Sequence, residues 1–546
     1  PTELRVGGKG LSEYKKSINM LLPWEGGWWR LGDIVEYELS STMSILKTAS
    51  LYREDILEFR NRMCREQVEL GKTEAPYYYI MPQAQHDLGE LVNLVNLMKE
   101  HGVEVYTLDE QVILDGKVYL SGDVVIPMAQ PFRPFIKEVM ETQEFPERHY
   151  TPGGELIKPY DITSWSLPLH RYVTSHEIDV RSKDLEGKLS LVEGTYDLKE
   201  EGTPQATAVV LPVKSNESFR AVFKALEKGL NVQRLKADAE LGSKTYGAGS
   251  FILYQGSKKK EWEAVIEDLP FEPAELLDKR AFPTTQVEVP RIALVETFFH
   301  DMDAGWTRFL FDSYHIPYTV LHPGDFKESD LTGDFDVVIF PDTDKEVLMT
   351  GKRKSGGTYY MGSYHPDYVK GIEKEGLEKL MTFSDQGGII ISWGRSARLF
   401  EGMMKIKKKD VEEEFSLPFR DISADLSKTG LYIPGSLVQV NLEEDHPLTL
   451  GMPESIGVFS RGRPVFRTSV PMFDMDRRVI GTYPEKEILL SGYAAEEEKM
   501  GNKAAMIWMK KGKGQFVLFG FGPQFRASTQ TSYKLLFNSI LLEKID

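Results

Sequence analysis

The sequence predicts an α/β protein of several domains, in which parallel sheets carry helices on both faces. The chain has 546 residues, more than a single hydrophobic core usually organises. In its second half, short apolar stretches such as 291–296 and 388–393 alternate with amphipathic stretches, which is typical of buried parallel strands joined by helices. Hydrophobic residues make up 41% and charged residues 27% of the chain, as in ordinary globular proteins.

The composition also limits the partners. The formal net charge of −17 disfavours general binding to nucleic acids or anionic membranes, because both need basic surface. Cys64 is the single cysteine, which excludes an intrachain disulfide and a thiolate metal cluster. The sequence contains no apolar run of about eighteen residues, the length that a membrane-spanning helix needs. We therefore expect neither a nucleic-acid nor a membrane partner.

Residues 1–70 are expected to form the tail and terminal helix of a larger domain. Apolar residues recur every three or four positions from Leu31 to Met63, which predicts one long amphipathic helix. Such a helix buries its apolar stripe against another element, yet the residues before it are polar and glycine-rich. We therefore expect the body of this domain to lie upstream of Pro1. The alternatives are packing on the units that follow or self-association, so a homo-oligomer stays open.

Two small α/β units are expected at 71–145 and 206–285, separated by a connector at 146–205 that is rich in proline and aromatic residues. Prolines together with large rings predict a connector that packs on its neighbours. Three landmarks recur in the same order in both units and indicate an internal repeat. They are Ile80-Met81-Pro82 and Val210-Leu211-Pro212, Gly102 and Gly229, and Tyr119-x-x-Gly122 and Tyr246-x-x-Gly249.

Residues 286–546 are expected to form one further α/β domain. Its apolar strands and intervening helices follow the order that builds flavodoxin-like folds, whose ligands bind beyond the carboxyl ends of the strands. Four polar residues lie at or directly after such strands, and they are our candidates for binding a small polar molecule or a peptide. These residues are Glu296, Asp342, Ser392 and Arg395.

The chain offers little for catalysis. The sequence has no H-E-x-x-H motif, and we interpret the spaced pair His101 and Glu104 as structural residues at a helix end. Ser392 and Ser396 flank the end of a strand, where a nucleophile elbow belongs, but the glycine pattern of that motif is missing. A hydrolase that uses one of these serines remains an alternative. Asp303 precedes Gly305 by two residues and is expected to cap the next helix.

The sequence also resembles a known family. PWEGGWWRLGDIVEYEL, at 23–39, is similar to the region directly after the catalytic core of large bacterial zinc carboxypeptidases, which are relatives of carboxypeptidase A with long C-terminal extensions. Further stretches resemble the same family in the same order, so the resemblance covers nearly the whole chain. These stretches are 127–135, 160–168, 303–308, 364–372 and 519–526.

This resemblance implies proteolysis, with release of C-terminal amino acids, by a whole protein whose zinc activates water and polarises the scissile carbonyl. In the family an H-x-x-E pair and a later histidine hold the metal, and a glutamate is the general base. No matching ligand motif occurs here, so we expect zinc in the whole protein and none bound by this chain. Glu3 is the one candidate general base. The resemblance also implies a periplasmic or secreted protein.

Residues 336–342 and 388–394 resemble two strands of the class I glutamine amidotransferase fold, the second of which leads to the nucleophile. No cysteine stands there, so amidotransferase chemistry is not expected. Our first hypothesis is a C-terminal region of a zinc carboxypeptidase-like protein, inactive by itself, that positions a peptide substrate or serves assembly with an upstream peptidase domain or fragment. The alternative is a stand-alone ligand-binding protein with a degenerate amidotransferase-like domain.

Overall fold

The computed structural model divides the chain into two compact units, 1–69 and 70–546. From residue 27 onward it describes 27–199, 205–277, 282–298, 301–355, 358–359, 364–408 and 411–545; before residue 27 it describes 5–6, 9–10, 16, 18 and 21–22. Candidate Glu3 lies outside the described residues.

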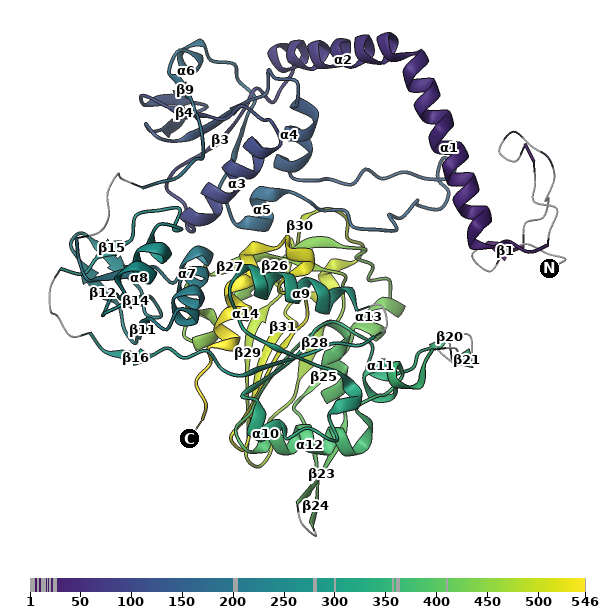
Figure 1. The fold of residues 1–546 in the computed structure, drawn as a ribbon, viewed down its shortest axis with the longest axis vertical. Helices are drawn as coiled ribbons and strands as arrows, with labels where there is room; N and C mark the ends of the chain where they lie inside the picture. Colours follow the sequence, from purple (N-terminus) through teal and green to yellow (C-terminus); the bar gives the residue numbers. More distant parts are fainter. Residues whose placement is uncertain are drawn as a thin grey trace. The chain divides into compact units, whose positions relative to one another are not determined.

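The predicted long helix is two helices. Helix α1 (Leu31–Leu51) ends at Tyr52, whose φ of −106° and ψ of 23° interrupt the helical geometry, and α2 (Arg53–Thr73) begins directly afterwards (Figure 1). Helix α1 has no buried residue, so its apolar side chains remain exposed among the described residues. No described helix of the chain is both long and apolar enough to cross a membrane.

The first small unit is a five-stranded sheet in the order β8-β3-β7-β4-β9. Helices α3 (Leu88–Glu100) and α4 (Arg133–Met140) contribute buried side chains to one face of this sheet. Its strands are β3 (Tyr78–Met81), β4 (Tyr106–Leu108), β7 (Val124–Pro127), β8 (His176–Ile178) and β9 (Leu189–Leu191). The unit therefore reaches beyond residue 145, because β8 and β9 come from the segment that we predicted to be only a connector.

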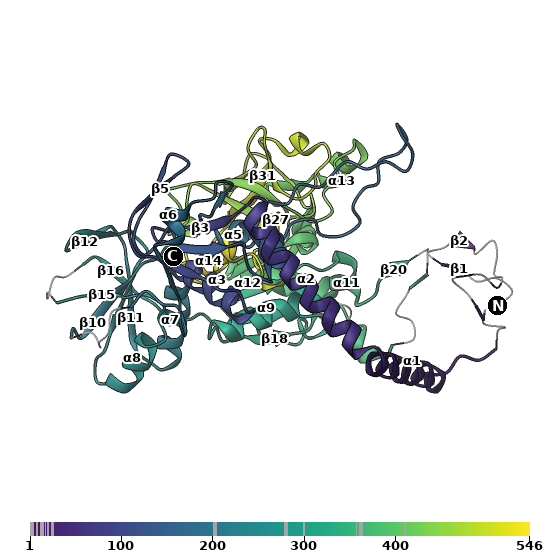
Figure 2. The same ribbon diagram turned by 90° about the horizontal axis from the view of Figure 1, so that it is seen from above.

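The second small unit has the corresponding strand order, β15-β10-β14-β11-β16. Helices α7 (Asn216–Glu227) and α8 (Lys259–Ile266) lie side by side on its sheet (Figures 1 and 2). Its strands are β10 (Ala208–Leu211), β11 (Asn231–Leu235), β14 (Phe251–Tyr254), β15 (Ala274–Glu275) and β16 (Thr284–Gln286). Gly122 and Gly249, which are landmarks of the proposed repeat, both have left-handed backbones, with φ of 91° and 89°.

The prediction of parallel sheets is wrong for both small units, because all described strand pairs in these sheets are antiparallel. The two strands that flank α3, β3 and β4, are not neighbours. Strand β7 lies between them and is antiparallel to both. The crossover helix is therefore present as expected, but a later strand of the same unit fills the gap that it spans.

The connector between the small units packs on the C-terminal region, as its composition predicts. Thr163 lies in this connector, and Gln143 lies just before its first residue. The Thr163 N–H donates to the carbonyl of Gly435 at 2.7 Å, and the Gln143 N–H donates to the Ser491 hydroxyl at 3.0 Å.

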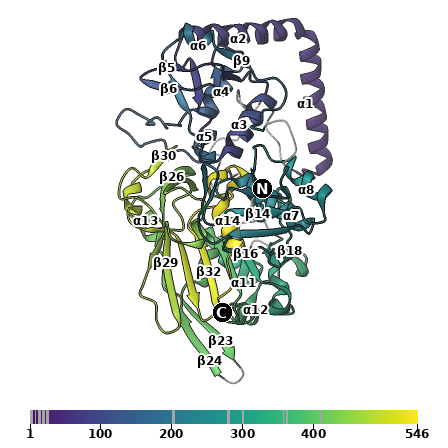
Figure 3. The same ribbon diagram turned by 90° about the vertical axis from the view of Figure 1, so that its left-hand side faces the viewer.

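The C-terminal region contains the predicted parallel sheet. Its parallel strands stand in the order β18-β17-β19-β22-β32, which is 2-1-3-4-5 when they are counted along the chain. They are β17 (Ile292–Val295), β18 (Thr319–Leu321), β19 (Val337–Phe340), β22 (Ile389–Trp393) and β32 (Gly514–Phe519). The sheet continues with the antiparallel strands β31 (Ala504–Lys511), β29 (Met475–Thr482), β26 (Ser436–Leu442) and β27 (Ser455–Ser460). Strands β32, β29 and β26 of this sheet are labelled in Figure 3.

Helices cover both faces of the parallel strands. Helices α9 (Met302–Ser313) and α14 (Tyr533–Ile540) share one core with the side chains of Ile292, Ile339 and Ile391. Helices α11 (Lys345–Thr350) and α12 (Glu373–Asp385) share the other core with the alternate side chains of the same strands. This alternation is the pattern that a doubly covered sheet requires.

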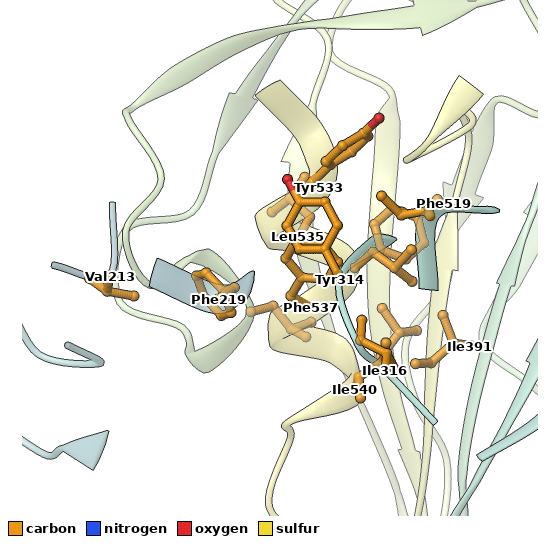
Figure 4. Close-up of a cluster of buried hydrophobic side chains, with 14 of the residues drawn as sticks. Val213, Phe219, Tyr314, Ile316, Ile391, Phe519, Tyr533, Leu535, Phe537 and Ile540 are labelled. Atoms are coloured by element: carbon orange, nitrogen blue, oxygen red, sulfur yellow. The ribbon is translucent and has the colours of Figure 1, made fainter. Parts of the chain in front are cut away.

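Helix α14 is buried between the sheet and the second small unit. The ring of Phe537 lies 5.5 Å from that of Phe219, on α7, and 4.8 Å from that of Tyr314, which follows α9 (Figure 4). Ile391 and Phe519 of the sheet lie in the same cluster. One continuous core therefore connects the second small unit to the C-terminal sheet.

A buried carboxylate, Asp87, joins three elements beside this core. It caps α3 by accepting hydrogen bonds from the first turn of that helix. It also accepts hydrogen bonds from the Ser215 hydroxyl (2.7 Å) and the Asn216 N–H (2.8 Å) at the start of α7, and from Nζ of Lys534 (3.3 Å) in α14. Asp87 and Lys534 are 1% and 3% exposed, so the contact is shielded from water.

Candidate functional site

A cavity of about 250 Å³ lies beyond the carboxyl ends of the parallel strands. Loops after several of these strands and after the antiparallel strand β27 line it. The lining residues include Asp303, Trp306, Asp342, Trp393, Gly394, Arg395, Phe459, Arg461, Arg463, Phe521, Phe525 and Arg526. The cavity lies where open α/β sheets bind their ligands.

Two of the predicted residues, Asp342 and Arg395, meet in this cavity. Asp342 follows β19 and Arg395 follows β22. The guanidinium donates to both oxygens of the carboxylate: Nε lies 3.1 Å from Oδ1 and 3.3 Å from Oδ2, and Nη2 lies 3.0 Å from Oδ2. Gly394 permits this approach, because its φ is +62° and a Cβ at this position would lie 2.3 Å from Oδ1 of Asp342. The turn after β22 therefore carries no side chain at its left-handed position.

Asp303 also faces the cavity, and the prediction that it caps a helix is wrong. Asp301 caps α9, accepting a hydrogen bond from the N–H of Ala304 at 3.2 Å. The Asp303 carboxylate accepts hydrogen bonds from the indole of Trp393 and from the Asp342 N–H, the latter at 2.9 Å. Burial, followed by the neighbouring charge of Asp342, raises the pKa of Asp303 to about 7. This carboxyl group therefore titrates near neutral pH.

Three further arginines, Arg461, Arg463 and Arg526, bring positive charge to the same cavity. Among the described residues, none of the three forms an ion pair with a carboxylate. Burial and then the nearby charges of Arg526 and Arg463 lower the pKa of Arg461. Arg526 has a left-handed backbone, with φ of 49° and ψ of 32°, a conformation that is strained for a residue with a side chain and is often found at functional sites. The three guanidinium groups repel one another and favour an anion between them.

Aromatic rings form the apolar wall of the cavity. The rings of Phe459 and Phe525 are stacked with their centroids 3.4 Å apart. The guanidinium groups of Arg461 and Arg526 lie over the Phe525 ring at 5.9 and 5.2 Å, within the range of a cation–π contact. Trp306 remains 37% exposed. The cavity thus combines apolar surface with three guanidinium groups that form no ion pair among the described residues.

The other predicted residues do not line this cavity. Glu296 pairs with Arg308 on α9 at 3.2 Å. Ser392 is fully buried and points away from the cavity that Trp393 lines, because neighbouring residues of a strand face opposite sides. The Ser396 hydroxyl is buried and hydrogen-bonded to the backbone of Pro341 and Thr343, so it is a structural group.

No three His, Cys, Asp or Glu side chains come together to hold a metal in the part of the chain that the structure describes. His101 ends α3, where its Nδ1 contacts the Leu97 carbonyl at 2.9 Å and its ring stacks on Phe135. The backbone N–H of Glu104 binds the Gln130 side chain. The described residues therefore do not fit a zinc centre.

Sequence reasoning missed Arg461, Arg463 and the role of Asp303. The two arginines follow β27 in the stretch Ser-Arg-Gly-Arg-Pro, at 460–464. Two arginines separated by a glycine after an apolar strand would predict a cationic site. The pattern assigns them to this cavity only if β27 is known to end beside the parallel strands. Phe525 and Arg526 lie in the stretch 519–526 quoted for the family resemblance, and Asp303 and Trp306 lie in 303–308.

Comparisons with known proteins give no family. No model of a protein family matches the chain, and no curated protein matches it. A solved structure described as a ThuA-like protein from Bacteroides uniformis has 11% identity, covers 47% of this chain and 94% of its own, and has a TM-score of 0.26. A cytoplasmic protein from Salmonella typhimurium has 10% identity, covers 47% of this chain and 100% of its own, and has a TM-score of 0.26. A β-galactosidase from Bacillus circulans has 12% identity, covers 51% of this chain and 34% of its own, and has a TM-score of 0.24.

Proposed function

We propose that this chain is a ligand-binding α/β protein whose cavity takes a small carboxylate with an apolar or aromatic body, such as the C-terminal residue of a peptide. The observation that carries this proposal is the set Arg461, Arg463 and Arg526, which crowd around one cavity without carboxylate partners among the described residues. Arginine binds carboxylates through paired, charge-assisted hydrogen bonds. The stacked rings of Phe459 and Phe525 suit the apolar body of such a ligand.

The same cavity argues for binding rather than nucleophilic catalysis. A nucleophile elbow places a reactive side chain on the tight turn after a strand. Here Gly394 occupies that turn, and the nearby serines are buried and do not line the cavity. The strand order 2-1-3-4-5 supports a flavodoxin-like domain, and we propose the finer assignment of a class I amidotransferase-like domain without its nucleophile.

We further propose that the chain is the C-terminal region of a zinc carboxypeptidase-like protein, as the family resemblance implies. In that protein an upstream peptidase domain or fragment would hold the zinc, and the cavity described here would position a peptide by its terminal carboxylate. A periplasmic or secreted location belongs to the same proposal. The carboxylate-binding cavity supports a role in substrate positioning more directly than a role in assembly.

Isothermal titration calorimetry with hippurate, a benzoylated glycine, tests the binding proposal. We expect a Kd of about 10 μM to 1 mM, as for a small ligand held by a few strong contacts. The neutral hippuramide is the matched ligand control and is expected to bind at least tenfold more weakly. Arg463→Gln is expected to weaken hippurate binding by about ten- to a hundredfold, since a hydrogen bond to a charged group contributes about 1.5–3 kcal/mol.

Arg467→Gln is the matched protein control, because Arg467 is an exposed arginine on β28 (Phe466–Thr468) and does not line the cavity. This variant is expected to bind hippurate like the wild type. Equal binding of hippurate and hippuramide, or equal weakening by both substitutions, would contradict a carboxylate site at this cavity.

A further inference from the structure

We propose that Asp303 is the specificity-determining residue of the cavity, and that it takes up a proton when a carboxylate ligand binds. The protonated group then offers a hydrogen bond to a neutral acceptor of the ligand, such as an amide carbonyl. This inference rests on the proposed function, because it concerns the same cavity and the same ligand class.

The position of Asp303 is fixed by groups from several elements. Its carboxylate accepts hydrogen bonds from the Trp393 indole, the Asp342 N–H and the Gln524 side chain, the last at 3.2 Å. The charged groups that face it are two carboxylates and a set of guanidinium groups. They are Asp301 on its own helix boundary, Asp342 after β19, Arg395 after β22, and Arg461, Arg463 and Arg526 across the cavity.

The two carboxylates of the cavity have opposite environments. Asp342 forms a bidentate contact with the Arg395 guanidinium. Asp303 has no such ion pair among the described residues, and burial together with the Asp342 charge raises its pKa to about 7. A carboxyl group with a raised pKa is available as a hydrogen-bond donor near neutral pH.

Ligand binding is expected to favour the protonated form of Asp303 further. A carboxylate that occupies the cavity displaces water and adds a negative charge near Asp303, and both effects disfavour the ionised carboxyl group. By linkage, a ligand that raises the affinity of Asp303 for a proton itself binds more tightly when the proton is present. The cavity should therefore prefer monoanions with a neighbouring neutral acceptor, and it should reject a second anionic group above neutral pH.

Calorimetry with hippurate tests this inference on the wild type without any substitution. Titrations at pH 7.5 in two buffers with different ionisation enthalpies report the protons taken up, and we expect net uptake of a substantial fraction of one proton. Hippurate itself does not titrate in this range, because its carboxyl pKa is near that of an α-carboxyl group. Affinity is expected to fall as the pH rises from 7 to 9, by at most tenfold per pH unit. Zero proton uptake would overturn the inference.

Asp303→Asn removes the titrating group while keeping its size. This variant is expected to show no proton uptake and no change in hippurate affinity between pH 6 and pH 9. Glu296→Gln is the matched control, because that carboxylate lies after β17 but pairs with Arg308 outside the cavity; it should retain the pH dependence of the wild type. Binding with an unchanged pH dependence in Asp303→Asn overturns the role of Asp303 alone, whereas no hippurate binding at any pH overturns the proposed function as well.

Discussion

Removing the carboxylate of Asp87 is predicted to destabilise the second compact unit strongly, because this one group connects both small α/β units to helix α14. Asp87→Ala leaves the ammonium of Lys534 buried without its carboxylate, and breaking a buried pair in this way costs about 3–5 kcal/mol. It also removes the cap of α3, a loss of about 1 kcal/mol. We therefore expect the free energy of unfolding to fall by about 4 kcal/mol or more.

Substituting the other partner should cost less. In Lys534→Met the Asp87 carboxylate keeps its hydrogen bonds from the backbone of α3 and from Ser215 and Asn216. Because these donors still stabilise the charge, we expect a loss of only about 1.5–3 kcal/mol, comparable to one hydrogen bond of a charged group. Asp87→Asn, which keeps an acceptor for the helix amides but loses the charge, should fall between the two.

Equilibrium unfolding in urea gives the order of the three variants. A chain with several domains need not unfold in one step, so hydrogen exchange at the amides of residues 88–91 and 216–219 should accompany it. In Asp87→Ala both segments are expected to exchange faster than in the wild type. A loss of less than 1 kcal/mol in Asp87→Ala, or a larger loss in Lys534→Met, would refute the argument that this carboxylate connects the units.

Three further predictions concern the cavity. Asp303→Asn should stabilise the protein at pH 8 by at most about 4 kcal/mol. Folding raises the pKa of the Asp303 carboxyl group from 3.8 to about 7, so the native state holds a proton between these pH values and the wild type loses stability as the pH rises through them. Urea unfolding at pH 3.5 and pH 8 should therefore show the gain only at the higher pH. Gly394→Ala should cost about 1–3 kcal/mol and weaken hippurate binding, because φ is +62° and the new Cβ meets Asp342; binding like that of the wild type would contradict this. Treatment with a chelator should leave hippurate binding unchanged. One zinc per chain, together with chelator-sensitive release of C-terminal amino acids, would contradict the proposal that an upstream domain or fragment holds the zinc.

The sequence was sufficient to predict the parallel sheet, but not the sheets of the small units. Strands β17, β19 and β22 are apolar on both faces, and only a doubly covered sheet accommodates such strands. The small units show the same local order of strand, helix and strand. Their antiparallel pairing depends on a later strand that lies between the two strands flanking the helix. This strand is β7 in the first unit, between β3 and β4, and β14 in the second, between β10 and β11. No local periodicity encodes that insertion.

The candidate site was predicted in part for a similar reason. Asp342 and Arg395 were found because each follows a parallel strand, and such strand ends meet at one edge of the sheet. Arg461 and Arg463 follow an antiparallel strand that joins the sheet five positions from β22. Their approach to the cavity depends on long-range packing, which the spacing of residues along the chain does not contain.

Asp303 shows how a correct local signal leads to the wrong residue. The start of α9 offers two aspartates, and either one satisfies the preference for a capping side chain. Asp301 takes that role, which frees Asp303 to turn toward the Trp393 indole at the end of β22. The helix cap is thus a local requirement that Asp301 meets. Asp303 has its position and its raised pKa because strands β19 and β22 place Asp342 and Trp393 beside it.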